Sequence, residues 1–224
     1  MKTSQLSFDL KPAGRGGARP GAGRPRQVGA KVLHRARERV PNYCPVHVTI
    51  KVRAGLPNLR HGRFVRAFRH ALAACSQRAG FRVVHYSIQH NHCHFVIEAR
   101  GKQALANGMK SLAARLARTA NRVFARRGGV LHGRYHSRVL RTPLEVRRAL
   151  AYVLLNHRHH ARRPGRPALD QASSGVWFDG WKDVKPVLPS RRREVVGPRS
   201  WLLGVGWRQH RLIRVGEIPG RGSR

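Results

Sequence analysis

The sequence predicts an α+β fold, in which helices pack on an antiparallel sheet. Apolar residues alternate with a period of two in some segments and recur at helical spacing in others. These segments follow one another in the order strand, helix, strand, strand, helix, strand, helix. We expect this domain at residues 43–160, between a basic, disordered arm at 1–42 and a basic, tryptophan-containing extension at 161–224 that folds back on the domain.

The first expected strand begins at Val46, where apolar and polar residues alternate. The apolar positions are Val46, Val48, Ile50 and Val52, and the polar ones are His47, Thr49, Lys51 and Arg53. A break at 55–58, which contains Gly, Pro and Asn, leads into an amphipathic segment. Large apolar side chains recur there at helical spacing, which predicts a helix that ends near Gly80.

Two further strands are expected at 81–89 and 92–99, and the two residues between them suit a hairpin. Side chains alternate between the two faces of a strand, so the residues of the second arm divide into two sets. Cys93, Phe95 and Ile97 form its buried face, and His92, His94 and Val96 point the other way.

The second half of the domain contains two helices and a short strand. An apolar stripe predicts a helix over 102–126, and 134–140 is the expected strand. The last helix has a clear N-terminal signal, with Thr142 as cap, Pro143 in the first turn and Glu145 at the capping-box position. Its register is therefore well defined.

The charge of the chain indicates a nucleic-acid partner. The sequence has 46 Lys and Arg against 9 Asp and Glu, for a formal net charge of +37, and such an excess needs a polyanion to neutralise it. The acidic residues are scattered singly, which excludes a site that holds two metals on clustered carboxylates. No apolar run is long enough to span a membrane, so we expect a cytoplasmic protein.

Two short patterns bring reactive side chains together. His92 and His94 lie two apart on a strand, on one side of the sheet and about 7 Å from each other, so both imidazoles can bind one cation. Tyr152 and Asn156 lie four apart on the last helix and share a face. A histidine pair that binds a metal, with a tyrosine hydroxyl beside a third, oxygen ligand, suits attack on a phosphodiester if the two elements meet.

Three motifs in this order resemble those of the HUH single-tyrosine transposases, where U is an apolar residue, and in particular the REP-associated tyrosine transposases of bacteria. They are Asn91-His92-Cys93-His94-Phe95, Gly133-Arg134-Tyr135-His136 and Ala151-Tyr152-Val153-Leu154-Leu155-Asn156. The resemblance covers roughly residues 43–160 and implies a ferredoxin-like HUH domain. One departure is His157, because members of that family commonly have proline after the asparagine.

The resemblance also implies an activity. His92 and His94 would bind Mg²⁺ or Mn²⁺, Asn156 would complete the metal site, and Tyr152 would be the nucleophile. The expected reaction is cleavage and strand transfer of single-stranded DNA through a 5′-phosphotyrosine intermediate, at hairpin-bearing repeats. The expected partner is single-stranded or hairpin DNA, and the sequence leaves open whether the protein is a monomer or a homodimer.

Arginines of the arm and of the later elements are expected to hold the DNA backbone and the hairpin stem. They are Arg24, Arg26, Arg115, Arg118, Arg122, Arg134, Arg138 and Arg148. Gly23-Arg24-Pro25 has the core tripeptide of an AT-hook, but a polycationic tail that binds without sequence preference explains it better.

The sequence leaves alternatives open for two residues and for the whole domain. Tyr135 is a rival nucleophile, although packing explains it better, and Asn156 suits an ordinary helix C-cap. The whole domain is also compatible with a nucleic-acid-binding protein derived from a transposase that no longer cuts DNA. An RNA-recognition module fits less well, because few aromatic residues occupy the central strands.

Overall fold

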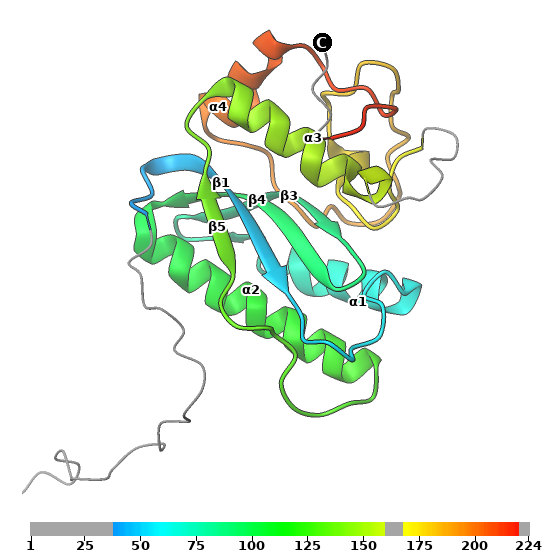
Figure 1. The fold of residues 1–224 in the computed structure, drawn as a ribbon. Coiled ribbons are helices and arrows are strands. Elements are labelled where there is room, and N and C mark those ends of the chain that lie inside the picture. The colour runs from blue at the N-terminus through cyan, green and yellow to red at the C-terminus, as the bar shows by residue number, and fades with distance from the viewer. Residues whose placement is uncertain (1–37, 160–167, 220–224) are drawn as a thin grey trace, which may run out of the picture. The chain divides into compact units, whose positions relative to one another are not determined.

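An antiparallel sheet forms the centre of the fold, as the sequence predicts, and it has five strands instead of the predicted four (Figure 1). The computed structural model describes residues 38–159 and 168–219, so Arg24 and Arg26 lie outside the described residues. The strand order is β2-β3-β4-β1-β5. The strands are β1 (Asn42–Lys51), β2 (Gln77–Arg78), β3 (Phe81–Ile88), β4 (His92–Arg100) and β5 (His136–Val139). The longer strands and the helices between them follow the βαββαβ order of ferredoxin-like folds.

Helices α1 (Gly62–Ala73) and α2 (Gly101–Val123) cover one face of the sheet (Figure 1). The apolar residues of β1 and the odd-numbered residues of β4, Cys93 to Ala99, point into this layer and are buried with both helices. The approach of α2 to the sheet is close: a Cβ atom on Gly108 would lie 2.1 Å from the Phe81 ring. The alternation that predicts the strands therefore fixes which side chains reach this core.

Helix α3 (Pro143–His159) lies on the opposite face (Figure 1). Its N-terminus has the predicted capping box: Glu145 N donates to Thr142 Oγ1 at 3.2 Å, and Thr142 N donates to Glu145 Oε2 at 3.2 Å. Val146, Leu150 and Val153 are buried in a second core. The cap and the apolar stripe together fix the rotation of α3, and thereby the direction in which Tyr152 points.

The described part of the C-terminal extension packs on the same face as α3. It contains η1 (Gly175–Trp177), α4 (Trp201–Gly204) and η2 (Gly206–His210). Trp181 and Trp207 are buried in the second core. Ser174 N donates to Tyr86 O at 3.0 Å, which ties the extension to β3. The extension therefore covers sheet surface that would otherwise be exposed to water, as the sequence predicts.

Two predicted boundaries are wrong. The first helix ends at Ala73 and not near Gly80, because the chain turns there and Gln77 and Arg78 pair with β3 as strand β2. The predicted helix over 102–126 ends at Val123. The helices within the described ranges include none that is long and apolar enough to span a membrane.

Candidate active site

Strand β4 places the two predicted histidines side by side. The Nε2 atoms of His92 and His94 lie 3.0 Å apart, and their ring centroids 4.7 Å apart. Nδ1 of His92 lies 2.8 Å from Asn91 Oδ1, and Nδ1 of His94 lies 3.0 Å from Thr49 Oγ1. Asn91 Oδ1 can accept a hydrogen bond from His92 Nδ1, and the Thr49 hydroxyl can accept one from His94 Nδ1. In that tautomer of the two neutral rings, both Nε2 atoms carry lone pairs that one cation can bind.

Helix α3 brings Tyr152 to this pair. The Tyr152 ring centroid lies 5.1 Å from that of His94 and 5.7 Å from that of His47, in both cases edge to face. Helix α3 and strand β4 therefore meet, which is the condition that the sequence pattern set. The rival nucleophile, Tyr135, instead packs against the core on the α1 and α2 face.

His47 and Thr49 belong to the site, and our sequence analysis did not assign them to it. Thr49 is the direct partner of His94 across β1 and β4, and His47 Nε2 lies 3.2 Å from His94 Nδ1. Burial lowers the pKa of His47 to about 4, so this ring is neutral at pH 7. The alternation in β1 does place both residues on the polar face, but only the register of β1 against β4 brings them to His94.

Asn156 lies one turn of α3 beyond Tyr152, as predicted. The residue is fully buried, and within the described part of the chain neither Oδ1 nor Nδ2 of its side chain has a hydrogen-bond partner. An unsatisfied buried amide costs about 1–3 kcal/mol. A helix C-cap does not explain this position, because α3 continues to His159.

These residues fit a divalent cation. Two nitrogens bound at about 2.1 Å and at right angles to each other lie about 3.0 Å apart, which agrees with the observed 3.0 Å between the Nε2 atoms of His92 and His94. Residues 38–159 and 168–219 contain no group of three His, Cys, Asp or Glu side chains placed to hold a metal. The orphaned amide oxygen of Asn156 is the candidate for the third protein ligand that the resemblance implies. All three donors are neutral, so the cation would keep its full charge.

The predicted DNA-binding arginines are not brought together. Arg115, Arg118 and Arg122 lie on α2, the helix on the face opposite α3. Arg148 is exposed on α3, and Arg138, on β5, donates to Glu145 Oε1 at 2.8 Å. Arg134 is exposed just before β5. The arginines of α2 are therefore separated from the histidines by the sheet.

Comparison with known proteins finds a similar family for the segment that carries the histidines. The family model described as "Transposase IS200 like" matches residues 44–138. This segment is therefore similar to IS200-like transposases, in agreement with the resemblance that the motifs predict. No curated protein matches the chain significantly.

Among solved structures, the chain is similar to one described as "Structure of the REP associates tyrosine transposase bound to a REP hairpin". The sequences are 13% identical, the match covers 55% of this chain and 70% of that one, and the TM-score is 0.46.

The transposase match includes His47, Thr49, His92 and His94 but ends before Tyr152. The link between the matched segment and the tyrosine helix therefore comes from the geometry of this chain. It consists of the ring contacts of Tyr152 with His94 and His47.

Proposed function

We propose that this protein cleaves single-stranded DNA in a reaction that depends on a divalent metal, and transfers the strand through a 5′-phosphotyrosine intermediate. The observation that carries the proposal is the contact between the Tyr152 ring and the ring of His94, one of two histidines whose Nε2 atoms converge. A tyrosine hydroxyl close to a cation that can polarise a phosphate has the arrangement needed for nucleophilic attack on phosphorus.

Tyr152 is the group that forms the covalent bond in this proposal. Its hydroxyl loses a proton and the oxygen attacks the scissile phosphorus. The bond from phosphorus to the 3′ oxygen breaks, and that oxygen leaves as a 3′-hydroxyl after it takes up a proton. The 5′ side remains attached to Tyr152. Attack by another 3′-hydroxyl on this phosphotyrosine reverses the chemistry and joins two strands, and no ATP is needed because the ester linkage is conserved at each step.

His92, His94 and Asn156 would hold Mg²⁺ or Mn²⁺, which as a Lewis acid polarises the phosphate oxygens. Asn91 and Thr49 accept from the Nδ1 atoms and so keep both Nε2 lone pairs directed at one point. Two imidazoles among three ligands favour Mn²⁺ over Mg²⁺, because imidazole is a softer donor than carboxylate or water.

The substrate in this proposal is single-stranded DNA near a hairpin. The net charge of +37 supports a polyanionic partner. Three of the predicted arginines are exposed: Arg134 just before β5, Arg138 on β5 and Arg148 on α3. In this proposal they contact backbone phosphates of the bound DNA. The arginines of α2 would contact DNA only if it extends around the sheet, and Arg24 and Arg26 would act from the arm.

A covalent trap tests the proposal. The full-length protein is incubated with hairpin-bearing single-stranded DNA and Mn²⁺ and run on a denaturing gel. We expect a protein–DNA adduct that Tyr152→Phe abolishes without loss of DNA binding. Tyr135→Phe is the matched control, because Tyr135 packs in the core away from the histidines, and this variant should keep the adduct. DNA binding without any adduct would instead identify a non-catalytic protein derived from a transposase.

A further inference from the structure

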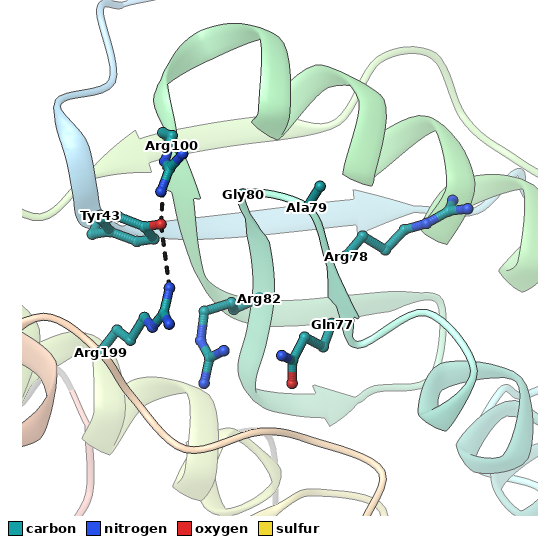
Figure 2. Close-up of a pocket in the computed structure, with 8 residues that line it drawn as sticks. All are labelled: Tyr43, Gln77, Arg78, Ala79, Gly80, Arg82, Arg100 and Arg199. Carbon is teal, nitrogen blue, oxygen red and sulfur yellow. Dashed lines mark hydrogen bonds between the residues drawn. The ribbon is translucent and has the colours of Figure 1, made fainter.

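A cavity of about 490 Å³ opens at the end of the sheet where β4 runs into α2 (Figure 2). Four segments that are far apart in the sequence meet there: the start of β1, the turn before β3, the end of β4 and the C-terminal extension. The residues that line it are Tyr43, Gln77, Arg78, Ala79, Gly80, Arg82, Arg100 and Arg199. Half of them are arginines and none is acidic, so the cavity is strongly electropositive.

Three of the arginines gather on one side of the cavity. Arg100 and Arg199 extend toward Tyr43, and Arg78 points away from it (Figure 2). The Arg82 guanidinium lies beside them and donates to Gly197 O of the C-terminal extension at 2.7 Å. The nearby carboxylate is that of buried Glu98, which lies 3.8 Å from Arg82 Nε and accepts a hydrogen bond from the backbone N of Arg199 at 2.8 Å. One carboxylate beside three guanidinium groups leaves a local excess of positive charge.

Tyr43 holds two of these guanidinium groups in place. Its hydroxyl accepts from Arg100 Nε at 3.2 Å and from a terminal nitrogen of Arg199 at 3.4 Å. Both guanidinium carbons also lie over the ring, 5.6 and 5.7 Å from its centroid. Each hydrogen bond uses one of the five N–H donors of a guanidinium. The tyrosine therefore preorganises two bidentate phosphate-binding groups.

The backbone at Tyr43 is strained. Its φ is 55°, in the left-handed region that a bulky side chain rarely adopts. The strand has an irregularity at the same place, where the register of β1 against β4 shifts between Asn42 and Pro45. A conformation of this kind is unfavourable and is typical of ligand-binding positions. The bulge turns the Tyr43 ring toward the two arginines.

We propose that this cavity binds phosphate groups of a nucleic-acid strand and is a second DNA contact, separate from the cleavage site. The inference rests on the proposed function for the identity of the polyanion. Arg100 and His94 are six residues apart on one strand, about 20 Å along its axis. At 3.4 Å per base pair, that length corresponds to roughly six base pairs of a hairpin stem. The cavity would thereby set where the scissile phosphate falls.

Fluorescence anisotropy with a labelled DNA hairpin tests this site. The wild type is compared with Arg100→Ala/Arg199→Ala, and the matched control is Arg63→Ala/Arg66→Ala, which removes two exposed arginines from α1. We expect the cavity pair to weaken binding at least about tenfold and to reduce the salt slope by about 1.4–1.8, the value for two lost phosphate contacts. The control pair should change the affinity less than about twofold.

The outcomes separate this inference from the proposed function. Equal losses in the cavity pair and the control pair, or no DNA binding by any variant, overturn the cavity site. A selective loss in the cavity pair supports the site even when wild-type protein forms no adduct with Mn²⁺, a result that would refute only the cleavage proposal. If thermal melting shows that the double variant does not fold, Arg199→Glu decides, because its exposed side chain lies outside both cores.

Discussion

The Tyr152 ring meets the His94 ring edge to face, with centroids 5.1 Å apart and an interplanar angle of 74°. The two residues come from α3 and from β4, and both belong to the same chain. The candidate nucleophile and a candidate metal ligand are therefore brought together within one chain.

Thr49 orients His94, so its removal should weaken metal binding. Thr49→Val keeps the shape of the side chain but removes the oxygen 3.0 Å from His94 Nδ1. Loss of such an outer partner typically costs 10–100-fold in metal affinity. We expect the Mn²⁺ concentration for half-maximal adduct formation to rise by about that factor. Thr119→Val, a buried position on α2, is the control, and equal half-saturation in both variants would contradict the assigned role.

Asn156 should lower stability in the metal-free protein, because its buried side chain has no partner among the described residues. Asn156→Leu replaces the orphaned amide with an apolar group of similar size, so we expect adduct formation to be lost and the free energy of unfolding to rise by about 1–2 kcal/mol. Urea unfolding in the presence of a chelator measures this. The control is Asn121→Leu, which removes an amide that donates to Gly128 O at 3.0 Å. This variant should lower the free energy of unfolding.

Local patterns predicted most of the fold. The alternation in β1, the two arms of the hairpin and the capping box of α3 depend on neighbouring residues, and the structure confirms each of them. The early end of α1 was missed because β2 consists of two residues whose pairing with β3 is a tertiary contact. No periodicity can reveal a strand of that length.

The sequence predicts only the part of the candidate site that depends on spacing within single elements. His92, His94, Tyr152 and Asn156 come from spacings within single elements. His47 is added by strand register, and the basic cavity around Tyr43 joins segments from residue 43 to residue 199. Contacts across such separations depend on how the elements pack, and no motif in one segment specifies them.

Asp170 should be a positioning residue for the end of α3. Its buried carboxylate accepts two hydrogen bonds from Arg60, at 3.0 and 2.6 Å, and lies 3.8 Å from His157 Nδ1, next to Asn156. Breaking a buried pair costs about 3–5 kcal/mol, and because the Arg60 side chain is 31% exposed we expect about 2 kcal/mol for Asp170→Asn.

Urea unfolding measures that loss, and the rate of adduct formation at saturating Mn²⁺ should fall as well. Asp179→Asn is the control, because Asp179 is 84% exposed in its pair with Arg208, and its effect should stay within about 0.5 kcal/mol. A destabilised Asp170→Asn protein with an unchanged rate would contradict the positioning role and leave only a structural one.

Stability should fall in mild acid because of His85. Burial lowers its pKa to about 3, whereas an unfolded histidine has a pKa of about 6.5. Below about pH 6.5 His85 therefore binds a proton in the unfolded chain but not in the folded chain. The free energy of unfolding should fall by up to about 1.4 kcal/mol per pH unit as the pH falls toward 3. Urea titrations between pH 7 and 4.5 should give a shallower slope for His85→Gln than for the wild type, whatever its absolute stability. The control is His70→Gln, at an exposed position on α1, which should keep the wild-type slope. If His85→Gln also kept the wild-type slope, His85 would not be the cause of the acid dependence.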